Sequence, residues 1–139
     1  MNNVIRRAVC DIEADSLTPT RIWCVVLKDT STGVVRALDN PSTMATELAS
    51  LVAEYDELIF HNGIEYDVPA IRKVLGVPIP KHKVVDTLVL SRLLNAKRQG
   101  GHSLGNWGSI LQFPKGDFNE FHQYSEEMLK YCINDVHLN

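Results

Sequence analysis

The chain has 139 residues, which is enough for one ordinary domain and leaves little room for a second. Hydrophobic residues make up 45% of it and charged residues 22%, so it can bury a core without disulfides or metals, and extensive disorder is excluded. The formal net charge of −3 argues against binding of duplex DNA through a broad basic face, although divalent cations could still bring a phosphate to a local acidic site.

The beginning of the chain predicts three antiparallel strands. Residues 4–12, 21–28 and 33–38 are rich in β-branched and aromatic residues. Turn signals at residues 17–20 and 31–33 separate them. We therefore expect a three-stranded meander.

An alternation of helices and strands follows. An amphipathic segment that begins at residues 41–43 predicts a crossover helix, so the apolar run at 57–60 should form a strand parallel to the first. The other expected elements are a helix over 67–75 stopped by Gly76, a strand at 84–85, and helices over 86–94, 102–111 and 125 to the end. The pattern predicts one α/β domain over residues 1–139, with a mixed central sheet flanked by helices.

Cysteine usage and the lack of targeting signals indicate the compartment. Cys10, Cys24 and Cys132 form no CxxC pair and lie in apolar stretches, which is typical of free buried thiols in a reducing environment. Charged residues interrupt the N-terminal stretch, and no segment approaches the ~20 apolar residues that span a bilayer. We expect a cytoplasmic protein, in the host cell if a phage encodes it, with no membrane contact.

The first candidate metal ligands are Asp11 and Glu13. Side chains two residues apart on a strand point to the same face, so these carboxylates should converge while Ile12 points into the core. Oxygen ligands of this kind suit Mg²⁺. About one such triplet arises by chance in a chain of this composition, so a solvated strand edge is the plain alternative.

Asp67 is the second candidate, because it follows the strand at 57–60 and begins a helix. A helix cap is its plain alternative. If the strand lies beside the first one, however, the loop that leaves its carboxyl end opens at the same sheet edge as Asp11. Carboxylates from distant parts of the chain would then meet.

The third candidate is the pair Tyr131 and Asp135 in the last predicted helix. A spacing of four residues places the phenol and the carboxylate on one helical face, about one turn apart. A core tyrosine with a surface aspartate is the alternative.

Taken in order, these motifs resemble the DEDD superfamily of 3′→5′ exonucleases, in its tyrosine-bearing subgroup. The stretches CDIEADSL, HNGIEYDVPAI, VVDTLVLSRLL, GGHSLGNWG and YCINDV are similar to the proofreading exonuclease domain of family A DNA polymerases, especially those of phages. The resemblance spans residues 9–136. It implies a ribonuclease-H-like (DnaQ-like) fold, in agreement with the predicted elements.

The resemblance also implies the site residues. The family's metal carboxylates fall on Asp11, Glu13, Asp67 and Asp135, and its active-site tyrosine falls on Tyr131. The histidine subgroup has a histidine five residues before the last aspartate, where this chain has Lys130.

The implied chemistry is hydrolysis of the 3′-terminal phosphodiester of single-stranded DNA by two divalent ions, Mg²⁺ or Mn²⁺, with release of 5′-mononucleotides. Asp11 would bridge the ions, Glu13 and Asp135 would complete the site of the attacking water, and Asp67 would support the ion at the departing 3′ oxygen. Because its phenol pKa is about 10, Tyr131 would orient the water rather than deprotonate it.

Other residues could contact the nucleic acid. Asn62 lies in an Asn-Gly turn, Leu17 could wedge beside the terminal base or enter the core, and His102 could have only a local hydrogen-bonding role. Arg92, Lys97 and Arg98 could bind phosphates, but the basic loop at 97–101 could equally be flexible and solvated. Asp86 is expected to cap a helix.

Three functions remain open. The first is a DNA 3′→5′ exonuclease, which stands alone or proofreads for a separate DNA polymerase. The second is an exoribonuclease of the same superfamily, and the third is a non-catalytic polymerase accessory module, which an intact carboxylate set disfavours. Polymerases of the family continue long past the last motif, whereas this chain stops at Asn139, so it is either a free-standing exonuclease or a piece of a longer protein whose last helix is cut short near Asp135.

Overall fold

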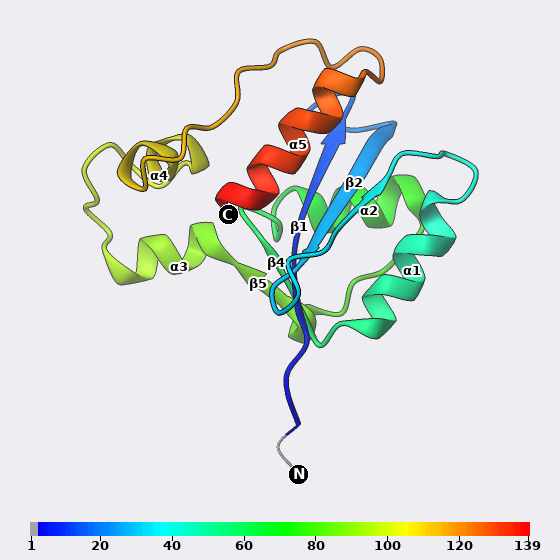
Figure 1. The fold of residues 1–139 in the computed structure, drawn as a ribbon, viewed down its shortest axis with the longest axis horizontal. Helices are drawn as coiled ribbons and strands as arrows, with labels where there is room; N and C mark the ends of the chain where they lie inside the picture. The colour runs from blue at the N-terminus through cyan, green and yellow to red at the C-terminus, as the bar shows by residue number, and fades with distance from the viewer. Residues whose placement is uncertain (1–2) are drawn as a thin grey trace.

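A central five-stranded sheet forms the framework of the computed structural model, which describes residues 3–139 (Figure 1). The strands are β1 (Arg7–Ala14), β2 (Ile22–Asp29), β3 (Val35–Leu38), β4 (Glu57–Phe60) and β5 (Val84–Asp86), in the spatial order β3-β2-β1-β4-β5. The helices are α1 (Met44–Glu54), α2 (Asp67–Leu75), α3 (Thr87–Leu94), α4 (Leu104–Ile110) and α5 (Glu126–Leu138), with a short 3₁₀ turn at Lys81–Lys83. No helix within residues 3–139 is long and apolar enough to cross a membrane.

The sheet is mixed, as the sequence predicts. β1 pairs antiparallel with β2, and β2 with β3, which confirms the meander. The crossover through α1 makes β4 parallel to β1, and β5 is parallel to β4. The helix over 67–75 ends where expected, because Gly76 adopts a left-handed φ of 68°.

The two faces of β1 have different partners. Its even-numbered residues, from Ala8 to Ala14, join the large core beneath α1 and α2. Val9 points the other way and packs with Cys132 and Val136 of α5. In Figure 1, α5 accordingly crosses one face of the sheet while α1 and α2 lie on the other. The strand period of two thus places Asp11 and Glu13 beneath α5.

The connection between α4 and α5 has little regular structure. Residues 113–120 contain no helix or strand, and the connection passes in Figure 1 as a long arch from α4 to the start of α5. The sequence predicts the two helices on either side but nothing about the course of this connecting segment (residues 111–125).

Candidate active site

Four carboxylates gather where β1, α2 and α5 meet. Glu13, Asp67 and Asp135 are only 7%, 3% and 5% exposed, and Asp11 is partly buried. Ile12 lies in the core on the opposite face of β1, as predicted. The alternative of a solvated strand edge is wrong for Asp11 and Glu13, because α5 covers this part of the strand.

Asp67 is the first residue of α2, and Tyr66 occupies the cap position itself. Burial raises the pKa of Asp67 to about 7, although the backbone N–H groups of Asp67 and Ile12 favour the charged form. Because Ile12 belongs to β1, this carboxylate contacts the strand that carries Asp11. The helix start therefore delivers its side chain to the sheet edge that the sequence indicates.

Neighbouring carboxylates raise the pKa values of Asp11 and Glu13. Burial raises the pKa of Asp11 well above its ordinary range, and the charges of Asp67, Glu13 and Asp135 add to this effect. Burial and the charge of Asp135 raise the pKa of Glu13 to about 8. A cluster of this kind holds protons near neutral pH unless cations occupy it.

Cys132 lies against the cluster, which the sequence does not indicate. Its thiol donates to Oδ2 of Asp11 at 3.5 Å, and one ligand atom from each of Asp11, Glu13 and Cys132 falls within 4.8 Å of the others. A thiol is a soft ligand, whereas Mg²⁺ and Mn²⁺ prefer carboxylate oxygen. The apolar context of Cys132 correctly predicts a free, buried residue but not its contact with Asp11.

Tyr131 and Asp135 share one face of α5, and a lysine joins them. Nζ of Lys115 lies 2.7 Å from Oδ2 of Asp135 and donates to the hydroxyl oxygen of Tyr131. Burial raises the pKa of Tyr131 above its ordinary value even though Lys115 opposes the shift, so the phenol is protonated at neutral pH. Lys115 comes from the connecting segment, where an isolated Pro-Lys-Gly carries no signal of a site.

The buried atoms of the cluster fit a divalent cation. Oδ1 of Asp135 is buried and has no hydrogen-bond partner within residues 3–139. A buried carboxylate oxygen is costly to leave unpaired, and a hard cation is the partner that it suits. Together with the protonated carboxylates, this oxygen indicates where a metal could bind.

Asp86 caps α3, as predicted, and also supports the loop after β4. Its carboxylate accepts from the backbone N–H groups of Leu88 at 3.0 Å, Asn62 at 2.9 Å and Ile64 at 3.1 Å. Asn62 adopts a left-handed φ of 66°, as its Asn-Gly turn favours. Asp86 thus shapes the loop that leads to Asp67.

Leu17 lies in the open rather than in the core. Its side chain is 91% exposed, and it borders a cavity of about 360 Å³ that Glu13, Tyr66 and Phe121 also line. The core alternative for Leu17 is therefore wrong. Its exposure next to a carboxylate of the cluster is compatible with contact to a bound strand.

The other predicted contact residues lie around α3 and α4. Nδ1 of His102 is 2.7 Å from the Ser91 hydroxyl oxygen, and the Trp107 indole donates to the same oxygen. The Arg98 guanidinium lies 4.2 Å from the centre of the Trp107 ring, so this part of the basic loop is anchored rather than freely solvated. Arg92 and Lys97 are exposed.

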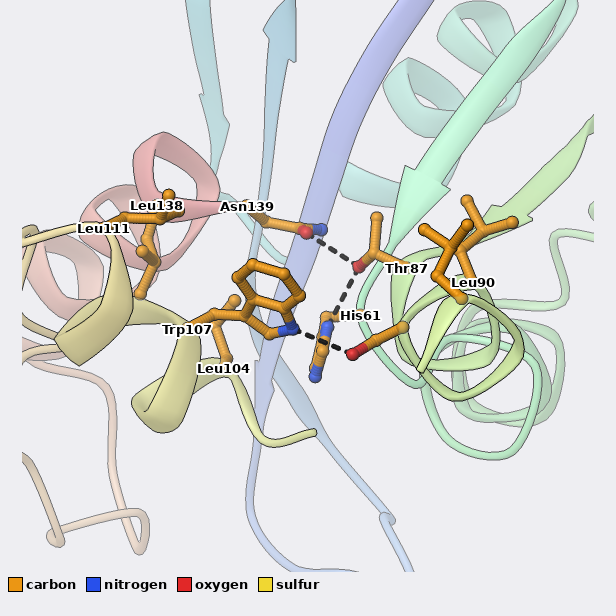
Figure 2. Close-up of a pocket in the computed structure, with 10 residues that line it drawn as sticks. His61, Thr87, Leu90, Leu104, Trp107, Leu111, Leu138 and Asn139 are labelled. Carbon is orange, nitrogen blue, oxygen red and sulfur yellow. Dashed lines mark hydrogen bonds between the residues drawn. The ribbon is translucent and has the colours of Figure 1, made fainter. Parts of the chain in front are cut away.

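A second cavity, of about 220 Å³, opens between α3, α4 and the end of α5. Figure 2 shows His61, Thr87 and Asn139 joined in it by hydrogen bonds, with the Thr87 hydroxyl 2.9 Å from Nδ1 of His61 and 2.7 Å from Oδ1 of Asn139. Leucines and Trp107 form most of its wall. These contacts tie the end of α5 to the loop after β4.

Comparisons with known proteins give relatives in sequence and in fold. No family model matches the chain. It is 31% identical to the DNA-directed DNA polymerase of Escherichia phage T7 and 30% identical to that of Enterobacteria phage T3, and in both cases the match covers 92% of this chain. The chain spans about a quarter of the length of these polymerases.

Solved structures that share the fold include the following two. NrnC of Brucella melitensis superposes with a TM-score of 0.75 at 22% identity, covering 97% of this chain and 69% of NrnC. RNase D of Trypanosoma brucei gives a TM-score of 0.72 at 20% identity, covering 96% of this chain and 55% of RNase D. NrnC has also been solved with bound Mg²⁺ and bound to pGG, and RNase D in complex with RNA U12.

Proposed function

The chain belongs to the DEDD superfamily of 3′→5′ exonucleases and has the ribonuclease-H-like fold of that superfamily. From this membership we propose that the chain hydrolyses the phosphodiester bond at the 3′ end of single-stranded DNA. The observation that carries the proposal is the convergence of Asp11, Glu13, Asp67 and Asp135 beside Tyr131. Burying four like charges without a counter-ion is costly, so the arrangement is best explained by cation binding.

The four carboxylates would hold two divalent ions, Mg²⁺ or Mn²⁺. The bound ions would supply charge stabilisation and an activated water in an in-line displacement. The charges of the other three carboxylates all raise the pKa of Asp11, and this favours it as the shared ligand. The Mg²⁺-bound structure of NrnC, which has the same fold, supports use of a divalent metal.

Tyr131 would place the attacking water or the phosphate through its hydroxyl. Its raised pKa keeps the phenol protonated at neutral pH, so it can donate a hydrogen bond but is a poor base. Leu17 borders the site, and Asn62 lies in the loop that leads to Asp67; both would contact the terminal nucleotide.

DNA is the substrate that homology favours, because two phage DNA polymerases are 31% and 30% identical to this chain. An exoribonuclease is the second candidate, since two proteins of the same fold have been solved with pGG and with RNA U12. Homology to polymerases also supports action together with a DNA polymerase, either as a separate protein or as part of one longer chain.

A gel assay separates the candidates. The purified chain is incubated with 5′-labelled single-stranded DNA and RNA of equal length, in Mg²⁺, in Mn²⁺ and in EDTA. A metal-dependent ladder on DNA, with 5′-mononucleotide products and faster cutting of frayed than of paired ends, is the expected result. A ladder on RNA alone would favour the exoribonuclease, and intact bands would favour a non-catalytic module. Rapid cleavage of circular single strands would contradict exonuclease action.

A further inference from the structure

Lys115 is the only cationic side chain with a described contact to the carboxylates of the site within residues 3–139. Its Nζ donates to Oδ2 of Asp135 and to the oxygen of Tyr131, and it lies 4.1 Å from the centre of the Tyr131 ring. The side chain is partly buried, so these contacts form away from bulk water.

The backbone just before Lys115 is fixed to α4 and α5. The N–H of Phe113 donates to the carbonyl of Gly108 at 2.9 Å, and a Cβ added to Gly108 would lie only 2.7 Å from the Phe113 carbonyl oxygen. Asn134 of α5 donates to the Pro114 carbonyl at 3.2 Å. The connecting segment therefore approaches α4 and α5 closely at the residues just before Lys115.

The segment is held again beyond Lys115. Phe118 and Phe121 lie 5.7 Å and 6.5 Å from Tyr131, measured between ring centres, and the Trp23 indole donates to the Phe121 carbonyl at 2.8 Å. Gly116 lies so close that a Cβ there would approach the Tyr131 ring to 3.0 Å. Lys115 thus projects from an anchored stretch of backbone toward the site.

The hydrogen bonds of Lys115 leave the Tyr131 proton and Oδ1 of Asp135 available to other partners. An ammonium group has three donors, and Asp135 and Tyr131 accept two of them. Because Lys115 donates to the phenol oxygen, the phenol proton is available to another acceptor. Because Lys115 holds Oδ2 of Asp135, the oxygen that remains for a cation is the buried Oδ1, which has no hydrogen-bond partner within residues 3–139.

We propose that Lys115 is a positioning residue for the reaction: it orients Asp135 so that Oδ1 faces the metal and orients Tyr131 so that its proton faces the water or phosphate. This inference rests on the proposed function. It requires Lys115 to stay in place when metal binds, since Oδ1 rather than Oδ2 is the ligand. An ammonium that merely fills an empty metal site would instead have to leave.

The experiment compares the parent with Lys115→Met, Lys115→Arg, Tyr131→Phe and the Lys115→Met/Tyr131→Phe double variant. Lys130→Met is the matched control, because Lys130 is an exposed lysine on the helix that carries Tyr131. Steady-state kcat and KM are measured on single-stranded DNA at saturating Mn²⁺. Mn²⁺ affinity is measured by titration calorimetry without DNA, and folding by thermal unfolding in EDTA.

Lys115→Met should lower kcat by roughly 10- to 100-fold with KM within about 3-fold, as expected when reacting groups are misplaced. Lys115→Arg should recover most of this loss, and Lys130→Met should match the parent. The double variant should be no slower than Lys115→Met. Lys115 orients the Tyr131 hydroxyl, so once the lysine is gone, removal of that hydroxyl should lower kcat no further. Mn²⁺ affinity of Lys115→Met should stay within about 3-fold of the parent, because Oδ1 is still present.

Three results would overturn the inference. First, the losses in kcat of Lys115→Met and Tyr131→Phe could multiply in the double variant. Second, the effect of Lys115→Met could appear in KM alone. Third, Lys115→Met could bind Mn²⁺ more than about 10-fold more tightly than the parent, as expected if Lys115 competes with the metal. Each leaves the proposed function intact, because the parent still cuts DNA. A folded parent with no nuclease activity would overturn the proposed function and this inference together.

Discussion

The residues of the candidate site come from two unlike regions of backbone. Asp11, Glu13, Asp67 and Asp135 project from regular elements, a central strand and two helices packed on it. Lys115 projects from the connecting segment, which has no regular structure between residues 113 and 120. The regular elements concentrate negative charge, and the irregular one brings the compensating positive charge. A rigid framework of strand and helices can hold carboxylates that repel one another, whereas an irregular segment can adopt the backbone path that brings a lysine to them.

The carboxylate cluster should dominate the activity. Asp11→Asn should reduce the rate of DNA hydrolysis by about three orders of magnitude or more, because the proposed metal site would lose a carboxylate ligand. Asp117→Asn, an exposed aspartate in the connecting segment, is the matched control and should keep the parent's rate. Gel assays in Mn²⁺ compare them, and a nearly active Asp11→Asn would remove Asp11 from the metal site.

The cluster should also control the pH dependence of stability in EDTA. Glu13 has a folded pKa of about 8 and Asp67 of about 7, both above the ordinary values of 4.5 and 3.8. Between these limits the folded state binds more protons than the unfolded state, so the free energy of unfolding should fall as pH rises from about 5 to about 8. In a domain of this size a loss of ~1 kcal/mol lowers Tm by roughly 3–6 °C.

Divalent metal should reverse this trend. By the proposed function Mn²⁺ would bind the deprotonated carboxylates, so the rise in Tm that it causes should be larger at pH 8 than at pH 5. Asp135→Asn should gain less from Mn²⁺ than the parent. Thermal unfolding at several pH values, with EDTA and with Mn²⁺, measures both effects. A Tm in EDTA that is flat or rises between pH 5 and pH 8 would show that the carboxylates do not share protons as the geometry indicates.

Sequence patterns predict the first region far better than the second. The period of two in β1 predicts that Asp11 and Glu13 share a face opposite Ile12, and the helical period predicts that Tyr131 and Asp135 share another. Parallel pairing of β4 with β1 brings Asp67 to the same edge. These inferences succeed because regular backbone repeats, so local spacing fixes the direction of a side chain.

The contacts of Lys115 and Cys132 could not be predicted in this way. Lys115 reaches Asp135 across 20 positions of the sequence, through an irregular path fixed by Gly108, Asn134 and the phenylalanines. Cys132 contacts Asp11, 121 positions away in the sequence, because α5 packs at one particular position along β1. Neither the path of the connecting segment nor the position of α5 along β1 follows from the periodicity of the sequence.

The close approach at Gly108 offers a way to disturb the connecting segment without touching the site. Gly108→Ala would place a Cβ 2.7 Å from the Phe113 carbonyl oxygen, and neither backbone can yield easily. We expect a loss of about 1–3 kcal/mol in unfolding free energy and a roughly 10-fold lower rate of DNA hydrolysis as Lys115 shifts.

Gly105→Ala is the control on the same helix, since its nearest neighbours would lie 3.9 Å away and alanine favours helix. It should be at least as stable as the parent and equally active. Urea unfolding and single-turnover rates test the pair. Equal activity of Gly108→Ala and the parent would show that the course of the segment does not matter to the site.

The smallest expected effect concerns Leu17, which belongs to neither region. Its loop is held by Thr20, whose backbone N–H and hydroxyl donate to Asp15, and by the Tyr66 hydroxyl, which donates to the Ser16 carbonyl at 2.9 Å. The Leu17 side chain is thus presented on an ordered loop while it remains 91% exposed. Since it packs against little in the free protein, Leu17→Ala should change Tm by no more than about 2 °C.

If Leu17 contacts the terminal base, its loss should appear in binding. Part of a leucine side chain buried against a base contributes on the order of 1 kcal/mol, so KM for single-stranded DNA should rise by roughly 3- to 10-fold while kcat changes less. Leu93→Ala, an equally simple truncation of a leucine 77% exposed on α3, should leave KM unchanged. Steady-state kinetics on one oligonucleotide decide the matter, and equal KM values for the two variants would mean that Leu17 does not touch the substrate.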